Sequence, residues 1–197
     1  MDRPVDDLII ISEQRPTRAD AVRNRDMLLC VARRMFDAYG VDAVTMTAIA
    51  HEAKVGKGTL YRNFPDKQSL CRELLDQEQR ELQQDTLARL RAPGEPFEHL
   101  VWFIDNVLAF VWRNLQILQI SDALPLAHPA HYWWRLTIRG LLQRINPAVD
   151  LDYLADTLFV LLDPRVIQYQ RDARGYSMER ISDALVRTAR RLLDSDT

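Results

Sequence analysis

The spacing of apolar residues predicts helices along most of the chain. Apolar positions recur every three or four residues over 17–40, and Gly40 is placed to end this helix in a left-handed conformation. Two short helical patterns, over 45–53 and 57–64, follow with almost no linker between them. No strand-like alternation lasts more than a few residues, so the sequence predicts an all-α fold. The apolar face of the first helix is expected to comprise Val22, Leu29, Ala32, Met35 and Phe36.

Longer helices are predicted after Pro65. Asp66 is placed to cap a helix over 67–90, and Asp163 followed by Pro164 is typical of a helix start. The segment 97–112 is apolar nearly all round, so its helix must be buried on most sides. The remaining expected helices span 132–145, 150–162 and a final stretch that begins after Ser177.

Positive charge is concentrated in the first third of the chain, although the net charge of the whole is -2. Between Arg18 and Lys67 there are nine basic and six acidic residues. This segment also contains every lysine of the chain, namely Lys54, Lys57 and Lys67. A positive segment on an acidic remainder is expected of a protein that contacts a polyanion with one end. The charge distribution therefore favours a nucleic acid as a partner.

The two short helices, braced by a longer helix on either side, have the form of a helix-turn-helix unit. The second helix of such a unit can lie in the major groove of DNA. Its start at Lys57 and Gly58 carries few bulky side chains, so its backbone N–H groups and positive dipole can approach a phosphate closely. Tyr61 and Asn63 are expected to point away from the buried side of the helix, and Lys67 adds a positive charge nearby.

The phrase AVTMTAIAHEAKVGKGTLYRNFPDKQSL, residues 43–70, strongly resembles the DNA-binding segment of the TetR family of transcriptional regulators. The resemblance implies an N-terminal three-helix helix-turn-helix DNA-binding domain, joined by a long fourth helix to a helical ligand-binding and dimerisation domain. We therefore expect a tail over 1–16, the DNA-binding domain over 17–65, and the ligand-binding and dimerisation domain over 66–197.

The resemblance also implies which positions contact DNA. Lys54 departs from the family, which usually has a turn glycine there. A lysine in a left-handed turn costs about 1 kcal/mol, so either the turn is slightly strained or Lys54 gains a contact at the DNA surface. A purely structural role for the segment accounts for Leu60 and Phe64, but not for an exposed tyrosine and clustered lysines. The expected DNA contacts are Thr45, Thr47, Lys57, Gly58, Thr59, Tyr61, Asn63 and Lys67.

All four tryptophans of the chain follow residue 100. Aromatic residues at helical spacing are usually ordinary core. The family resemblance implies instead that this part of the chain holds a small-molecule pocket, whose largely apolar effector alters the spacing of the two DNA-binding heads of a dimer. Under that interpretation the candidate pocket residues are Trp102, Phe103, Phe110, Tyr132, Trp133 and Trp134.

The last two helical patterns carry leucine-rich stripes with charged residues on the opposite side. A monomer could bury these stripes internally, whereas two copies could pair them in a four-helix interface. The resemblance implies the second arrangement. The candidate dimer-interface residues are Leu154, Leu158, Leu161, Ile181, Leu185 and Leu192.

The sequence indicates no metal site, cofactor or catalytic residues. Cys30 and Cys71 lack metal-ligand or CxxC spacing and are expected to be buried free thiols. His128 and His131 are expected at the surface or in the pocket wall, because no cysteine or carboxylate cluster accompanies them. The chain has no signal-peptide pattern and no apolar run long enough to cross a membrane, so we expect a cytoplasmic protein without a membrane partner.

We therefore predict a homodimeric, ligand-responsive transcriptional regulator that is not an enzyme. We expect it to act as a repressor on palindromic double-stranded DNA with half-sites about 34–36 Å apart, and to be released by a small effector. Two alternatives stay open at this point. One is a small all-α enzyme that acts on an apolar substrate in the aromatic pocket, and the other is a helical adaptor that binds another protein.

Overall fold

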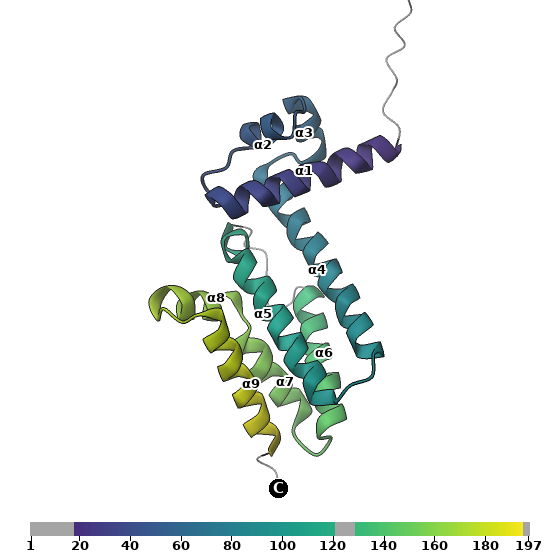
Figure 1. Cartoon of the computed structure of the whole chain (residues 1–197), viewed down its shortest axis with the longest axis vertical. Coiled ribbons are helices and arrows are strands. Elements are labelled where there is room, and N and C mark those ends of the chain that lie inside the picture. The colour runs from purple at the N-terminus through teal and green to yellow at the C-terminus, as the bar shows by residue number, and fades with distance from the viewer. Residues whose placement is uncertain (1–17, 121–128, 195–197) are drawn as a thin grey trace, which may run out of the picture.

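The computed structural model describes residues 18–120 and 129–194, and helices account for most of these residues (Figure 1). No strand occurs within these two ranges, so the predicted all-α fold is confirmed. A π-helix, η1 Tyr169–Ala173, continues directly from α8 Pro164–Gln168. The helices are α1 Arg18–Tyr39, α2 Met46–Glu52, α3 Lys57–Asn63, α4 Lys67–Arg91, α5 Pro96–Ile120, α6 Pro129–Ile145, α7 Leu151–Leu161, α8 Pro164–Gln168, η1 Tyr169–Ala173 and α9 Met178–Asp194.

Helices α1 to α3 form a unit that we call the head. Leu28 on α1, Ile49 on α2 and Leu60 on α3 are fully buried in its apolar centre. Phe64, which follows α3, and Leu70 on α4 are buried in the same core. Because α1 lies across one end of α4, with α2 and α3 beyond it, the short helices are held at the far end of the molecule from the C-terminus (Figure 1).

The prediction that five residues form the buried apolar face of α1 is wrong for one of them. Val22 is 55% exposed, whereas Leu29, Ala32 and Phe36 are buried as expected and Met35 is partly buried. The first turns of α1 extend beyond the helices that it crosses, so an apolar residue there has nothing to pack against (Figure 1). Helical spacing identifies the face of a helix, but not where along its length that face is covered.

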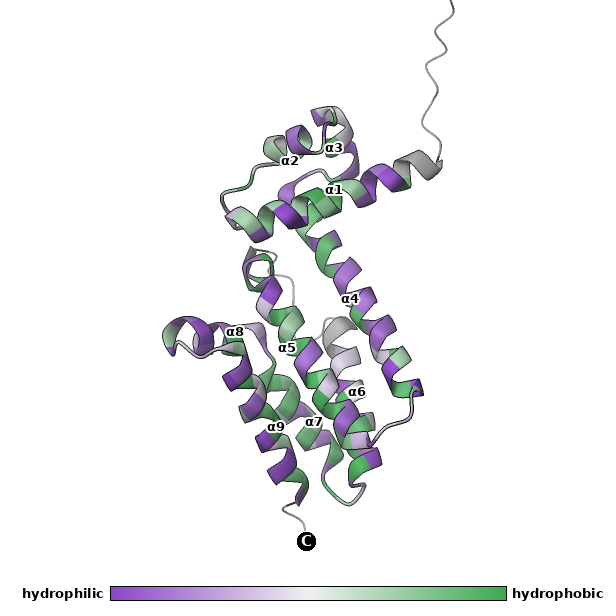
Figure 2. Cartoon of the chain, viewed as in Figure 1, coloured by the Kyte–Doolittle hydropathy of each residue, from purple (hydrophilic) through white to green (hydrophobic). Residues whose placement is uncertain are grey.

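Helices α4 to α9 form a second unit that we call the body, with α5 at its centre. α5 packs against α4, α6, α8 and α9, as its nearly all-round apolar pattern predicts. It continues past Trp112 as far as Ile120. Hydrophobic residues are concentrated on α5 and α7, and hydrophilic residues are frequent along α4 (Figure 2). The buried apolar residues of α5 include Leu100, Phe103, Ile104, Val107, Leu108, Val111 and Leu115.

Helix starts follow the capping residues that the sequence indicates. The Thr45 and Asp66 side chains accept hydrogen bonds from the backbone N–H groups of Ala48 and Ser69. Asp163 caps α8 directly before a proline at the first helical position. The π-helix η1 has no equivalent signal, and π-helical turns in other proteins often lie at functional sites.

Replacing Gly94 with alanine is expected to destabilise the fold by roughly 1–3 kcal/mol. A Cβ atom at Gly94 would lie 2.9 Å from Nε2 of His99, and His99 is fully buried, so it has little room to move. Gly140→Ala is the matched control, because Gly140 lies within α6 and its Cβ would have no neighbour within 4 Å. The control should be neutral or stabilising. Denaturant unfolding of both variants tests the prediction, and equal effects would contradict it.

Candidate nucleic-acid interface and the cavities of the body

The turn between α2 and α3 is tight and fixed by backbone hydrogen bonds. The N–H of Val55 donates to the carbonyl of Ala50 at 3.0 Å, and the N–H of Lys54 donates to the carbonyl of His51 at the same distance. Lys54 has a φ of 55°, so the left-handed turn expected at this position is present. The turn therefore holds a conformation that favours glycine, with an exposed lysine in it.

Replacing Lys54 with glycine is expected to stabilise the protein by up to about 1 kcal/mol, because glycine adopts a positive φ without steric cost. Lys57→Gly is the matched control, since Lys57 begins α3 and has no positive φ. The control should be neutral or destabilising, as glycine is a poor helix former. Thermal unfolding measures both changes. If Lys54→Gly lowers stability, the lysine side chain makes a contact that outweighs the strain.

Helix α3 presents an open surface at its start. Lys57 and Gly58 are exposed, and a Cβ on Gly56 or Gly58 would meet nothing within 4 Å. Tyr61 is 46% exposed, while its neighbour Leu60 is fully buried. The start of α3 is therefore accessible to a large partner, as the sequence predicts for a helix that enters a DNA groove.

Two other predicted contact residues are partly engaged within the head. The side-chain amide of Asn63 donates from Nδ2 to the Thr59 carbonyl at 2.8 Å, at the last residue of α3. Thr59 is itself partly buried, and its Oγ1 lies 3.4 Å from Nη2 of Arg62. The amide oxygen of Asn63 has no comparable hydrogen bond to the described residues. Its assignment to a base edge stays a prediction.

Lys67 lies at the start of α4, beside the segment that connects α1 and α2. Its Nζ is 3.4 Å from the carbonyl of Asp42. Asp66 precedes it as the N-cap, and hydrogen bonds from the Ser69 backbone and side chain lower the pKa of Asp66. The exposed side chains of Thr45 and Thr47 belong to the start of α2. The predicted DNA-contacting residues thus cluster at the starts of α2, α3 and α4, and along α3.

Arg25 supports this surface and was not anticipated from the sequence. Its guanidinium lies over the Phe64 ring at 4.6 Å and donates to the carbonyl of Asn63 at 3.1 Å. It also pairs with Glu73 on α4 at 2.5 Å. Burial raises the pKa of Glu73, but hydrogen bonds from Arg25 and Arg80 outweigh burial and lower it overall. Arg25 therefore ties the end of α3 to α1 and α4.

A buried polar cluster joins the head to the body. Nη2 of Arg33, on α1, lies 2.5 Å from Glu78 Oε1 on α4 and donates to Asn114 Oδ1 on α5, also at 2.5 Å. The Asn114 amide in turn donates to Glu78 Oε2 at 2.7 Å and to the carbonyl of Phe110 at 2.9 Å. The cluster fixes α1 against two body helices with directional bonds.

A second contact lies beside this cluster, at the end of α1. Arg113 on α5 pairs with Asp37 on α1 at 3.2 Å. The N–H of Val41 donates to Oε1 of Gln116 on α5 at 3.0 Å. The C-terminal half of α5 therefore carries several of the polar groups that hold the head.

The predicted pocket residues lie on α5 and α6, and four of them form edge-to-face pairs. Phe103 packs against Trp133 with ring centres 5.6 Å apart, and Phe110 packs against Trp134 at 5.7 Å. Phe103 and Trp134 are buried, and Phe110 and Trp133 are partly buried. The other two candidates differ, since Trp102 is partly buried and Tyr132 is 61% exposed. Their role as a ligand wall stays a prediction.

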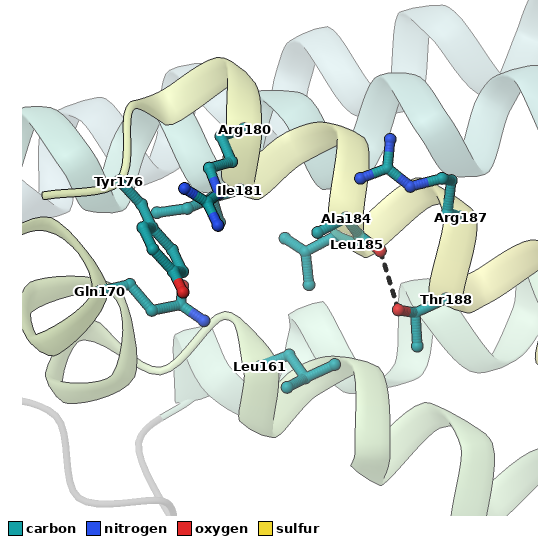
Figure 3. A pocket seen from close by; sticks show the side chains of 9 residues that line it. All are labelled: Leu161, Gln170, Tyr176, Arg180, Ile181, Ala184, Leu185, Arg187 and Thr188. Atoms are coloured by element: carbon teal, nitrogen blue, oxygen red, sulfur yellow. Dashed lines mark hydrogen bonds between the residues drawn. The ribbon is translucent and has the colours of Figure 1, made fainter. Parts of the chain in front are cut away.

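Two cavities lined by described residues lie elsewhere, one within the body and one where the head meets the body. One, of about 320 Å³, lies between α9 and the segment from α7 to η1 (Figure 3). The apolar side of this cavity is formed by Leu161, Ile181, Ala184 and Leu185. The second cavity, of about 260 Å³, lies between α1, α5 and η1. Neither includes any of the six predicted pocket residues.

The leucine stripe proposed for the dimer interface faces mainly inward within one chain. Leu154, Leu158, Ile181 and Leu185 are buried in the chain's own core, and Leu161 and Leu192 are partly buried. Helical spacing alone could not separate an inward-facing stripe from an interface. The apolar side chains that α7 exposes to solvent include Tyr153 at 69% and Val160 at 50%.

The cysteine prediction is correct for one residue of two. Cys71 is buried, and burial raises its pKa to about 11, which keeps the thiol protonated at neutral pH. Cys30 is exposed on α1, so its expected burial is wrong. His128 lies outside the described residues, and the side chain of His131 is likewise outside them.

The sequence of the head matches a known family. Residues 28–74 match the profile of "Bacterial regulatory proteins, tetR family". An HTH-type transcriptional regulator of Staphylococcus aureus is 46% identical over 54 residues, a match that covers 27% of this chain and 29% of that protein. A regulator of the same type from another strain of this species is 27% identical over 173 residues, covering 82% of this chain and 90% of its own.

Solved structures resemble the fold over most of the chain. A transcriptional regulator from Saccharomonospora viridis, in complex with choline, is 25% identical, with a TM-score of 0.68 over 83% of this chain and 94% of its own. A TetR-family regulator from Pectobacterium atrosepticum is 19% identical, with a TM-score of 0.70 over 91% and 96%. Within the described residues, no helix is both long and apolar enough to span a membrane.

Proposed function

Since this chain belongs to the TetR family of transcriptional regulators, we propose that it is a repressor that binds a palindromic operator as a homodimer. The accessible start of α3 carries this proposal, because Lys57, Gly58 and Tyr61 are exposed on a compact head. Helix α3 enters the major groove, and the starts of α2 and α4 bind the flanking phosphates. Proteins of this family are not enzymes, which removes the enzyme alternative.

The effector is small and largely apolar, and it binds beside the aromatic residues of α5 and α6. The regulator from Saccharomonospora viridis was solved with choline, a quaternary ammonium compound. Aromatic rings recognise such cations through cation–π interactions, and the Phe103–Trp133 and Phe110–Trp134 pairs supply aromatic surface here. Choline carries a positive charge, but its three N-methyl groups present an apolar surface to aromatic rings, so it is the first effector to test.

The homodimer forms through the outer faces of α7 and α9. Tyr153 and Val160 are exposed on α7, and their spacing of seven positions places them on one face of the helix. The 320 Å³ cavity lies between α7 and α9, with the apolar side chains of Leu161 and Ala184 on opposite sides (Figure 3). Two such pairs of helices related by a two-fold axis give a four-helix interface.

Selection of random duplex DNA by the purified protein at low and high salt tests the proposal. We expect enrichment of a palindrome at low salt and steep loss of binding as salt rises, because phosphate contacts release counterions. Addition of choline should release the selected DNA, and sedimentation should show a dimer. Enrichment of no sequence at either salt, with and without choline, contradicts the proposed operator binding.

A further inference from the structure

The 260 Å³ cavity, which we call the junction hollow, lies where the head meets the body. Phe36 and Asp37 line it from the C-terminal end of α1, and Gly40, which directly follows that helix, also lines it. The remaining lining residues come from the body, on α5 and η1, and are Trp112, Arg113, Gln116 and Arg171. Anything bound in the junction hollow would therefore touch both units.

The polar groups that line the junction hollow are mainly hydrogen-bond donors. Gln116 uses its amide oxygen to accept a hydrogen bond from the N–H of Val41, so its two amide N–H groups remain as donors for a ligand. Asp37 supplies a carboxylate, but its Oδ1 lies 3.5 Å from Arg33 and its Oδ2 accepts from Arg113 at 3.2 Å. The Asp37 carboxylate is thus paired with two arginines, while two guanidinium groups and an amide offer further N–H donors.

The two arginines are accessible and only weakly engaged. The Arg113 side chain is 53% exposed and pairs with Asp37 at 3.2 Å and, more distantly, with Glu78 at 3.8 Å. The Arg171 side chain is 30% exposed, pairs with the adjacent Asp172 at 2.7 Å, and lies 5.5 Å from the Trp112 ring centre. Ion pairs this open to solvent contribute little to stability. An incoming ligand can therefore displace the carboxylates from them at small cost.

We propose that the junction hollow is a binding site for a small anion, a carboxylate or phosphate compound, held by Arg113, Arg171 and the Gln116 amide. Guanidinium groups match the planar, acceptor-only geometry of carboxylates and phosphates. The hollow is smaller than the roughly 300–1,000 Å³ of pockets for drug-sized ligands, so the anion is small. Trp112 contributes an aromatic side chain to the lining.

Occupation of the site changes how the head is held. An anion that binds Arg113 competes with Asp37, which is the α1 partner of that arginine. Asp37 also contacts Arg33, a member of the buried cluster with Glu78 and Asn114. The anion thus loosens one of the contacts that orient α1. Its effect on operator binding rests on the proposed function, whereas anion binding itself does not.

Titration of the full chain without DNA tests the site. Inorganic phosphate and acetate are added separately at constant ionic strength, with tryptophan fluorescence and calorimetry as readouts. We expect saturable binding of at least one anion, weakened about tenfold or more in Arg171→Gln, as expected for lost hydrogen bonds to a charged group. The tighter of the two anions identifies phosphate or carboxylate chemistry. Trp112→Phe should remove the fluorescence change but keep the calorimetric signal.

Arg144→Gln is the matched control, because Arg144 is an exposed arginine in the last turn of α6. It should bind the anion as the wild type does. Absence of saturable binding for both anions, or equal weakening by Arg171→Gln and Arg144→Gln, overturns the proposal. Because no DNA is present, these results are independent of whether the operator proposal holds.

Discussion

Replacing Glu78 with alanine is expected to lower the free energy of unfolding by about 3–5 kcal/mol, because a buried arginine loses its main counter-charge. The Arg33 side chain is only 11% exposed, and that of Glu78 is 16% exposed. The same change removes the carboxylate that accepts from the Asn114 amide at 2.7 Å. Urea unfolding followed by circular dichroism measures the loss.

Glu81→Ala is the matched control for this change. Glu81 lies on the same helix, is exposed, and accepts a hydrogen bond only from Gln77 among the hydrogen bonds found in the described residues. Its replacement should alter stability by no more than about 0.5 kcal/mol. If Glu78→Ala costs no more than Glu81→Ala, then Asp37 and Asn114 suffice to compensate Arg33, and the buried cluster is not what secures the head.

Helix limits near the head could be predicted from the sequence because their causes are local. Asp66 and Ser69 are three positions apart, and their mutual hydrogen bonds start α4 where the sequence indicates. Thr45 caps α2 for the same reason. The positive φ of Lys54 was also foreseeable, since the α2–α3 turn requires it whichever residue occupies the position.

Contacts between distant segments could not be predicted in this way. Arg33 and Asn114 are 81 positions apart, and Arg25 and Glu73 are 48 apart. Neither pair leaves a local pattern, because each arginine resembles any other polar residue on a helix. Trp112 illustrates the same limit, since it continues an apolar run in the sequence but lines a polar hollow in the fold. Only the packing of α1 against α4 and α5 places these groups together.

The contacts that hold the head on the body are largely polar, and their polarity has a functional consequence. An apolar contact tolerates sliding, whereas hydrogen bonds and ion pairs require defined positions of both partners. The C-terminal half of α5 holds the head through Asn114 and Gln116, and Asn114 also donates to the carbonyl of Phe110 in the aromatic set. A shift of α5 at Phe110 would therefore act on Arg33 through a single side chain. This connection offers a short physical route from the proposed effector site to α1.

Replacing Tyr61 with alanine is expected to weaken operator binding at least thirtyfold. A lost hydrogen bond to a charged group such as a phosphate costs about 1.5–3 kcal/mol, and a dimer loses it twice, so the total exceeds about 2 kcal/mol. Tyr61 is 46% exposed on α3 beside the buried Leu60, so its removal should leave the head folded. Fluorescence anisotropy with the selected operator measures the affinity.

Tyr39→Ala is the control for Tyr61→Ala, because Tyr39 is a 70% exposed tyrosine at the end of α1. It should bind the operator with nearly wild-type affinity. Since the phenol is neutral, Tyr61→Ala should leave the salt dependence of binding unchanged, whereas removing a lysine that contacts phosphate should reduce the slope by about one. Equal affinities for the wild type and Tyr61→Ala would place the DNA-binding face elsewhere on the head, because Tyr61 is the largest side chain that α3 exposes.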